Sequence, residues 1–225
     1  MGIRGWLALI ASFMLAAPGS RPLAQPSSAP ELAAALQKKY GTVRDFSADF
    51  VQTYRGGVLN RQMKDSGRVM VRKPGKMRWE YKAPDEKLFV SDGSRVYWYI
   101  PQDKQVQIGD VPPDDQATTP ALFLAGKGDI TRDFTPSLVE PPAGYPPGAQ
   151  ALKLVPNTPQ AEYDWLIIVV DPGTLALRGL VTGDSQGGTS SFSFTNLKEN
   201  VGLADKLFTF TPPRGVEVVN DSSRR

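Results

Sequence analysis

The sequence contains neither cysteine nor histidine among its 225 residues. The absence of cysteine excludes disulfide bonds, thiol nucleophiles and a lipid-modified cysteine, so we expect the fold to depend on its hydrophobic core. The absence of histidine excludes a Ser-His-Asp triad, and the two absences together remove the typical ligands of zinc and copper. We therefore expect neither a metal site nor the common nucleophilic hydrolases.

Signatures of phosphate and nucleotide binding are lacking as well. Gly126-Lys127-Gly128 has neither the upstream glycine nor the Ser or Thr of a P-loop, and no strand leads into a glycine-rich dinucleotide turn. A two-carboxylate glycosidase needs paired acids, but Glu80 and Asp85 are typical of a solvated sheet position and a turn. We therefore expect a protein that is not an enzyme and has no cofactor.

Neither sign of charge dominates. Lys and Arg number 26 against 23 Asp and Glu, and without Arg4 and Arg21 of the N-terminal segment the count is 24 against 23, a net charge of about +1. A nearly neutral chain without a basic cluster is poorly suited to neutralising phosphates. We therefore expect no nucleic-acid partner.

The apolar run near the N-terminus is too short to cross a membrane. It covers residues 6–17, WLALIASFMLAA, whereas a spanning helix needs about 20 apolar residues. Arg4 before the run and small residues after it complete the pattern of a secretory signal peptide. We predict a signal peptide over residues 1–24, with cleavage after Gly19 or Ala24, and export of a soluble protein into the periplasm.

The stretch over residues 67–101 predicts four β-strands joined by tight turns. The turns are marked by Pro-Gly at 74–75, Pro-Asp at 84–85 and Asp-Gly at 92–93. Between them apolar and charged side chains alternate, which predicts a sheet with one apolar and one charged face. The apolar face carries Val69, Val71, Met77, Trp79 and Tyr81, and the charged face carries Arg68, Arg72, Arg78, Glu80 and Lys82.

Two short helices are predicted outside this sheet. The first covers residues 31–40, begins with a capping box formed by Ser28 and Glu31, and ends at Gly41. The second covers residues 118–126 and is apolar all round, so it is either a plug for the end of a barrel or a movable lid.

Further strands are predicted on both sides of these elements. They cover residues 45–55, 104–108, 150–155, 163–171, 175–183 and 189–198, with one more extended piece inside 207–218. No repeat or linker divides the chain, so we predict a single domain over residues 25–225.

Bulky apolar side chains are frequent on the predicted sheet faces. A curved sheet with a wide apolar inner face, covered by short helices, is typical of a cavity for lipophilic ligands. The spacing leaves open whether that interior is filled or hollow. The bulky residues are Phe46, Phe50, Met77, Trp79, Trp98, Trp165, Phe192 and Phe194.

Several segments, taken in order, resemble the family of periplasmic outer-membrane lipoprotein carriers, the LolA family. The matching segments are 45–52, 71–84, 90–93, 97–101, 119–124 and 208–216. The resemblance implies a mainly β fold with a few short helices: an incomplete, strongly curved antiparallel β-barrel with a helical lid over an apolar cavity. It also implies a monomeric chaperone that takes acylated lipoproteins from an inner-membrane ABC transporter to the outer membrane, where some organisms have a lipoprotein receptor.

The resemblance assigns the site residues as well. The cavity wall would consist of Phe46, Phe50, Val69, Val71, Met77, Trp79, Tyr81 and Trp98. The lid would contribute Leu32, Leu36, Leu122 and Phe123.

In the family, an arginine directly before the proline of the first central turn holds the lid by hydrogen bonds to helix backbone. Here that position is Lys73, and an arginine stands one residue earlier, at Arg72. Lys73 shares its face with Val69 and Val71, so we assign the latch to Lys73 and leave open whether Arg72 shares it.

Two other hypotheses compete with the carrier. A sensor or regulator of the same fold would bind a lipid or a peptide signal, and such relatives usually have an additional C-terminal domain, which we do not expect in this chain. A closed β domain with a filled core would have no cavity. Acylated cargo on protein purified from the periplasm would separate the carrier from both.

Overall fold

The computed structural model describes residues 26–56, 62–111, 126, 128–160 and 163–220. The predicted signal peptide lies outside the described residues. So does the predicted helix over 118–126, apart from Gly126.

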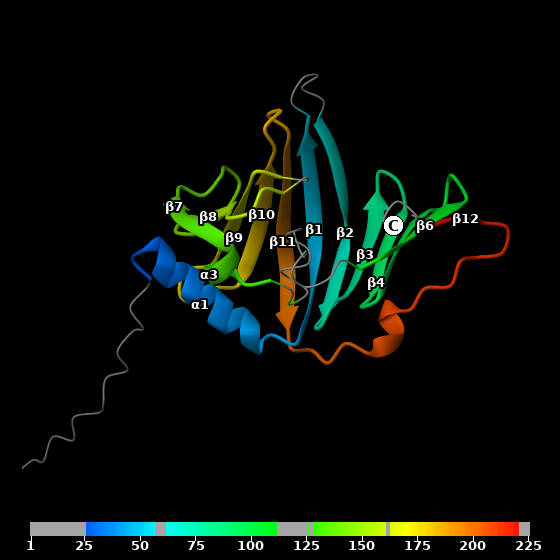
Figure 1. Ribbon diagram of the computed structural model, residues 1–225, viewed down its shortest axis with the longest axis horizontal. Helices are drawn as coiled ribbons and strands as arrows, with labels where there is room; N and C mark the ends of the chain where they lie inside the picture. The colour runs from blue at the N-terminus through cyan, green and yellow to red at the C-terminus, as the bar shows by residue number, and fades with distance from the viewer. Residues whose placement is uncertain (1–25, 57–61, 112–125, 127, 161–162, 221–225) are drawn as a thin grey trace, which may run out of the picture.

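The described strands form one open sheet of twelve strands in the order β12-β6-β5-β4-β3-β2-β1-β11-β10-β9-β8-β7 (Figure 1). The sheet is curved, and we call the face that packs against helix α1 (Ala29–Thr42) the inner face. The strands are β1 (Asp45–Arg55), β2 (Gln62–Arg72), β3 (Lys76–Ala83), β4 (Lys87–Asp92), β5 (Arg95–Ile100), β6 (Gln105–Asp110), β7 (Phe134–Val139), β8 (Gln150–Pro156), β9 (Trp165–Val170), β10 (Leu177–Gly183), β11 (Thr189–Glu199) and β12 (Glu217–Asn220).

The predicted meander is confirmed in strands β2 to β5. In the register of β2 and β3, Val69 lies opposite Trp79 and Val71 lies opposite Met77. All four side chains are at most 5% exposed, so the alternation in the sequence does separate a buried from a charged face.

β1 joins the two parts of the sheet, because it pairs with β2 on one side and β11 on the other. Bulges interrupt the register at Ser47/Asp49 and at Ser66/Gly67, and bulges of this kind bend a strand and increase its twist. At Gly67 a Cβ would lie 1.9 Å from the carbonyl oxygen of Glu80, so only glycine permits this close approach.

Helix α1 begins with the predicted capping box, in which Ser28 accepts from the Glu31 amide and Glu31 accepts from the Ser28 amide. The predicted end at Gly41 is wrong, because the helix continues to Thr42. The next residue, Val43, has an extended backbone and is 2% exposed. The chain therefore passes from the helix directly into β1, and no glycine in the left-handed conformation ends the helix. The Thr42 hydroxyl donates to the Lys39 carbonyl at 2.7 Å and completes the last turn.

A short helix and an edge strand after residue 128 were not predicted. The short helix α3 (Ile130–Asp133) is capped by Asp129, whose carboxylate accepts from the Thr131 and Arg132 amides. It leads into β7, an edge strand that contains Pro136. Proline within a run argues against a central strand but is tolerated at a sheet edge.

The C-terminal segment crosses the outer face of the sheet. The 3₁₀ helix η2 (Asp205–Phe208) packs on β3 and β4, with Phe208 only 1% exposed, and Phe210 lies 5.6 Å from the rings of Tyr97 and Tyr99. After this crossing β12 pairs in parallel with β6. The predicted antiparallel arrangement therefore holds for every other described strand pair, and the long crossover accounts for the exception.

Candidate functional site

Aromatic rings from five strands are in contact on the inner face. Phe50 of β1 meets Trp79 and Tyr81 of β3 edge-on, with ring centroids 5.1 and 5.0 Å apart. Each such pair contributes about 0.5–1.5 kcal/mol beyond its buried area. We call this set the aromatic cluster, and its members are Phe50, Trp79, Tyr81, Phe89, Trp98, Phe192 and Phe194.

The residues predicted for the cavity wall all lie on this face. Tyr81 and Trp98 are half-buried, and the others are buried. Phe89 was missed, although it lies opposite both Trp79 and Trp98 in the sheet. Its face depends on the register after the turn at 84–85, which alternation within a single strand does not reveal.

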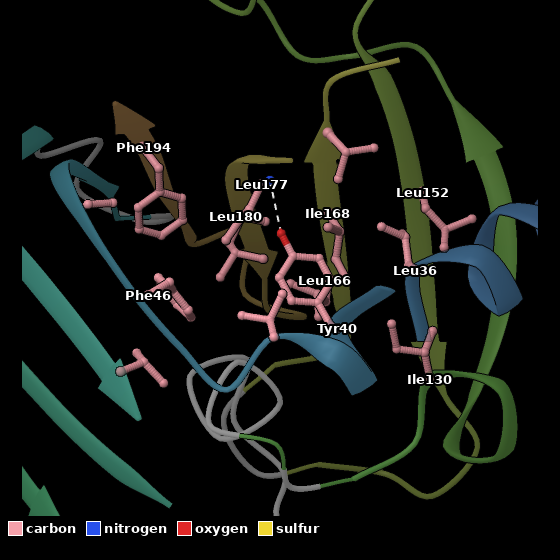
Figure 2. Close-up of a cluster of buried hydrophobic side chains, with 14 of the residues drawn as sticks. Leu36, Tyr40, Phe46, Ile130, Leu152, Leu166, Ile168, Leu177, Leu180 and Phe194 are labelled. Carbon is pink, nitrogen blue, oxygen red and sulfur yellow. Dashed lines mark hydrogen bonds between the residues drawn. The ribbon is translucent and has the colours of Figure 1, made fainter. Parts of the chain in front are cut away.

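The half of the inner face next to α1 is filled. Figure 2 shows Leu36 and Tyr40 of the helix among side chains of β8, β9 and β10, with Ile130 of α3 beside them. Leu32 and Leu36, predicted as lid positions, are both 0% exposed and belong to this core. Leu122 and Phe123, the other predicted lid residues, lie outside the described residues.

The other half of the inner face keeps partly exposed rings. Tyr81, Phe89, Trp98 and Phe192 are half-buried on β3, β4, β5 and β11. Three of these rings pack against the buried core, and the fourth, Trp98, contacts Tyr81 and Phe89. Met77 of β3 is 1% exposed and belongs to the same buried core. An apolar ligand can therefore contact ring faces here, and the flexible Met77 side chain can repack around it.

Lys73 lies between the sheet and the end of α1. Its Nζ donates a hydrogen bond to the carbonyl oxygen of Tyr40, and its backbone N–H donates to the Arg44 carbonyl at 2.8 Å. The Tyr40 carbonyl is in the last turn of α1, so this bond attaches the C-terminal end of the helix to the turn after β2. Burial lowers the pKa of the Lys73 ammonium group.

Arg72 points to the opposite face. Its guanidinium donates to the Leu203 carbonyl at 2.9 Å and lies 3.2 Å from the Asp205 carboxylate. These neighbouring cations therefore hold different segments, Lys73 the end of α1 and Arg72 the segment that leads into η2.

Helix α1 is also bound to the β9–β11 side of the sheet. The Tyr40 hydroxyl accepts a hydrogen bond from the Leu177 N–H at 3.0 Å (Figure 2), and burial, with the charge of Glu199, raises the pKa of Tyr40. The Lys39 ammonium lies 3.0 Å from a Glu199 carboxylate oxygen and donates to the Thr174 carbonyl at 2.9 Å. These bonds join one side of the last helical turn to β10 and β11.

Gly126 lies against the side chain of Lys73. It has a φ of 83°, and a Cβ at this position would lie 2.7 Å from the Lys73 Cδ. An alanine in this left-handed conformation costs about 1–2 kcal/mol. Because the Lys73 side chain must also shift, we expect Gly126→Ala to lower the free energy of unfolding by more than this backbone cost. Urea unfolding measures the loss.

Gly144→Ala is the matched control for this substitution. Gly144 has a φ of 100° and no atom within 4 Å of its would-be Cβ, so it tests the backbone cost alone. Equal losses in the two variants would show that the contact with Lys73 contributes nothing.

Polar side chains also lie on the inner face, and sequence reasoning singled out only Tyr81 among them. The Tyr81 hydroxyl donates to the Gln52 side-chain oxygen at 3.2 Å, and the Lys87 ammonium lies 3.0 Å from Asp65. Burial, with the charge of Asp65, raises the pKa of Tyr81 to about 12. Gln52 is separated from Phe46 and Phe50 by an even number of positions in β1. This spacing alone could have predicted that its side chain lies on the inner face.

Comparison with known proteins identifies the family. The family model described as outer membrane lipoprotein carrier protein LolA matches residues 41–211. The chain belongs to the LolA family. The matched part of this LolA-family chain contains the wall residues predicted above and Lys73.

Relatives cover most of the chain. An outer-membrane lipoprotein carrier protein of Chromohalobacter salexigens is 32% identical over 200 residues, which are 88% of this chain and 89% of the relative. Its counterpart in Nitrosomonas europaea is 34% identical over 78% of this chain and 82% of its own.

Solved structures extend the comparison to the fold. A crystal structure of an uncharacterized conserved protein from Thermus thermophilus shares the fold of this LolA-family chain. The TM-score is 0.50 at 16% identity, covering 84% of this chain and 96% of the other. Among the described residues of this chain, no helix has the length and apolar character needed to span a bilayer.

Proposed function

We propose that the protein binds the acyl chains of lipoproteins on the aromatic half of its inner face and carries them through the periplasm to the outer membrane. The observation that supports this most directly is the row of half-buried rings of Tyr81, Phe89, Trp98 and Phe192 next to the buried apolar core. Each buried CH₂ group gains about 0.8 kcal/mol, so an acyl chain needs a protein surface of this kind to cross water. Family membership supports the same cargo.

The proposed role includes the form of the mature protein and its partners in transport. The mature protein would be a monomeric single domain over residues 25–225 that is exported by its signal peptide and catalyses no reaction. It would receive lipoproteins from an inner-membrane ABC transporter and deliver them to the outer membrane, through a receptor where the organism has one. The transfer needs no chemistry in the carrier, because only the location of the acyl chains changes.

Loading and release require that the inner face can open. Helix α1 is bonded to the β9–β11 side through Tyr40 and Lys39, whereas Lys73 joins it to the end of β2. We propose that breaking the Lys73 bond lets β2 to β5 move away from α1 and admits the acyl chains. Cargo that binds only the open state shifts the equilibrium toward that state. The Lys73 bond stabilises the empty, closed state, so re-forming it would oppose cargo binding and help to expel the cargo.

Native mass spectrometry of protein purified from the periplasm tests the proposal. We expect a fraction of the molecules to carry an acylated lipoprotein, and we expect the delipidated protein to take up a synthetic diacylated cysteinyl peptide. Protein purified after detergent washing is the control for carried-over membrane lipid. Absence of cargo from cells together with failure to bind the synthetic peptide would exclude the carrier function.

A further inference from the structure

A row of polar side chains crosses the inner face beside the aromatic cluster. Gln52 of β1 lies opposite Asp65 of β2, and Tyr81 of β3 lies opposite Lys87 of β4. Ser190 of β11 continues the row beyond Gln52. We call these five residues the polar row. It crosses β1 toward the end of the strand that is farther from α1, because the helix leads into β1 at Asp45.

Hydrogen bonds hold the polar row in place. The Gln52 amide donates to the Ser190 hydroxyl at 3.2 Å and accepts from the Tyr81 hydroxyl at 3.2 Å. The Lys87 ammonium donates to Asp65 at 3.0 Å and lies 5.6 Å from the centroid of the Tyr81 ring. The same Tyr81 ring contacts Phe50 at 5.0 Å, so the polar row borders the aromatic cluster directly.

The polar row has donors to spare. An ammonium group carries three N–H donors, and among the described residues Asp65 takes one of those of Lys87. The Gln52 amide has two N–H donors, of which Ser190 accepts one. The side chains of Lys87 and Asp65 are 27% and 16% exposed, so a ligand can reach them, yet burial makes their hydrogen bonds stronger than in open water.

The charge of the polar row favours a neutral ligand group. Its cation, Lys87, is already paired with a carboxylate, Asp65, so the row offers N–H and O–H dipoles rather than net positive charge. A phosphate would meet the Asp65 carboxylate, whereas a carbonyl oxygen needs only a donor. Acyl chains that lie along the aromatic cluster would bring their ester carbonyls to this border.

We propose that the polar row binds the glyceryl-ester carbonyl groups of the acylated cargo, with Lys87 and Gln52 as donors. This inference rests on the proposed carrier function and adds an orientation to it. The acyl chains lie over the rings toward α1, and the glyceryl group and the attached protein lie at the opposite end of the inner face. The site would then recognise the linkage as well as the hydrocarbon.

Two synthetic probes separate recognition of the linkage from binding of the chains. One is an N-acetylated cysteinyl peptide with an S-dipalmitoylglyceryl group, and the other carries hexadecyl chains on ether linkages without the ester carbonyls. For the wild-type protein we expect the ester probe to bind about tenfold more tightly, the effect of one or two hydrogen bonds. Displacement of an environment-sensitive fluorophore from the delipidated protein measures both affinities.

Lys87→Met is the decisive variant, because it removes the donor and keeps most of the stem over Tyr81. We expect it to bind the ester probe as weakly as the ether probe, while its affinity for the ether probe stays unchanged. Arg78→Met is the control: it removes a cation from an ion pair with Glu80 on the outer face and should change neither affinity. If Lys87→Met lowers the melting temperature too far, Gln52→Leu replaces it.

The outcomes distinguish this inference from the carrier function. Equal binding of the two probes by the wild-type protein, or an equal loss for both probes in Lys87→Met, would overturn the polar row as a recognition site and leave the carrier function standing. Binding of neither probe would overturn both.

Discussion

Trp79→Glu is expected to abolish uptake of acylated peptides. Trp79 is 5% exposed and its ring lies 5.1 Å from Phe50 and 5.3 Å from Phe192, at the centre of the aromatic cluster. The substitution removes a large apolar side chain, which alone costs about 3–5 kcal/mol in a packed core. It also places a carboxylate among rings, where ionisation is strongly disfavoured and the pKa of the new carboxyl group rises. Fluorescence titration with the diacylated peptide measures uptake.

Arg78→Glu is the matched control, because Arg78 is the next residue on the same strand and faces outward. It loses an ion pair with Glu80 and a hydrogen bond to the Leu207 carbonyl, at an expected cost of about 1 kcal/mol, and uptake should remain nearly intact. Trp79→Phe distinguishes the effect of the added charge from the effect of the lost indole ring. It retains an aromatic side chain and should retain most of the uptake. Equal loss of uptake in Trp79→Glu and Arg78→Glu would show that the inner face is not the binding face.

Lys73→Leu is expected to leave uptake possible and to stall release. The substitution removes the hydrogen bond from the Lys73 ammonium group to the Tyr40 carbonyl, and loss of a partly buried bond from a charged donor costs about 1–3 kcal/mol. The closed state is then populated about five- to 150-fold less relative to the open state, so closure no longer helps to expel the cargo. The measurement is transfer of preloaded acylated cargo from the variant to outer-membrane vesicles.

Lys73→Arg and Arg72→Leu complete this test. Lys73→Arg should release like the wild type or close more tightly, because a guanidinium presents several donors in a fixed plane. Arg72→Leu should loosen the segment around Leu203 and Asp205 on the outer face and leave transfer nearly unchanged. Stalled release in Arg72→Leu with normal release in Lys73→Leu would assign the latch to the arginine.

The sequence could predict the elements whose signals are local. Pro74-Gly75 and Asp92-Gly93 mark turns, and the alternation between them placed Val71, Met77 and Trp79 on one face, which the exposures of these side chains confirm. The capping box at Ser28 is equally local, since its two partners are three residues apart.

The features that were missed depend on contacts between distant segments. The edge strand β7 carries Pro136 and shows no simple alternation, so its pairing with β8 decides its structure. The parallel pairing of β12 with β6 follows from a crossover over the outer face. The polar row gathers residues from β1, β2, β3, β4 and β11, and the register across those strands brings them together.

An open sheet leaves two edges to which a second molecule could add a strand. Here one edge strand, β7, contains Pro136, which has no N–H to offer a neighbour, and the other, β12, is only four residues long. A second copy would therefore find an incomplete set of hydrogen-bonding groups at either edge. The incomplete backbone at both edges thus protects the sheet from polymerising strand by strand.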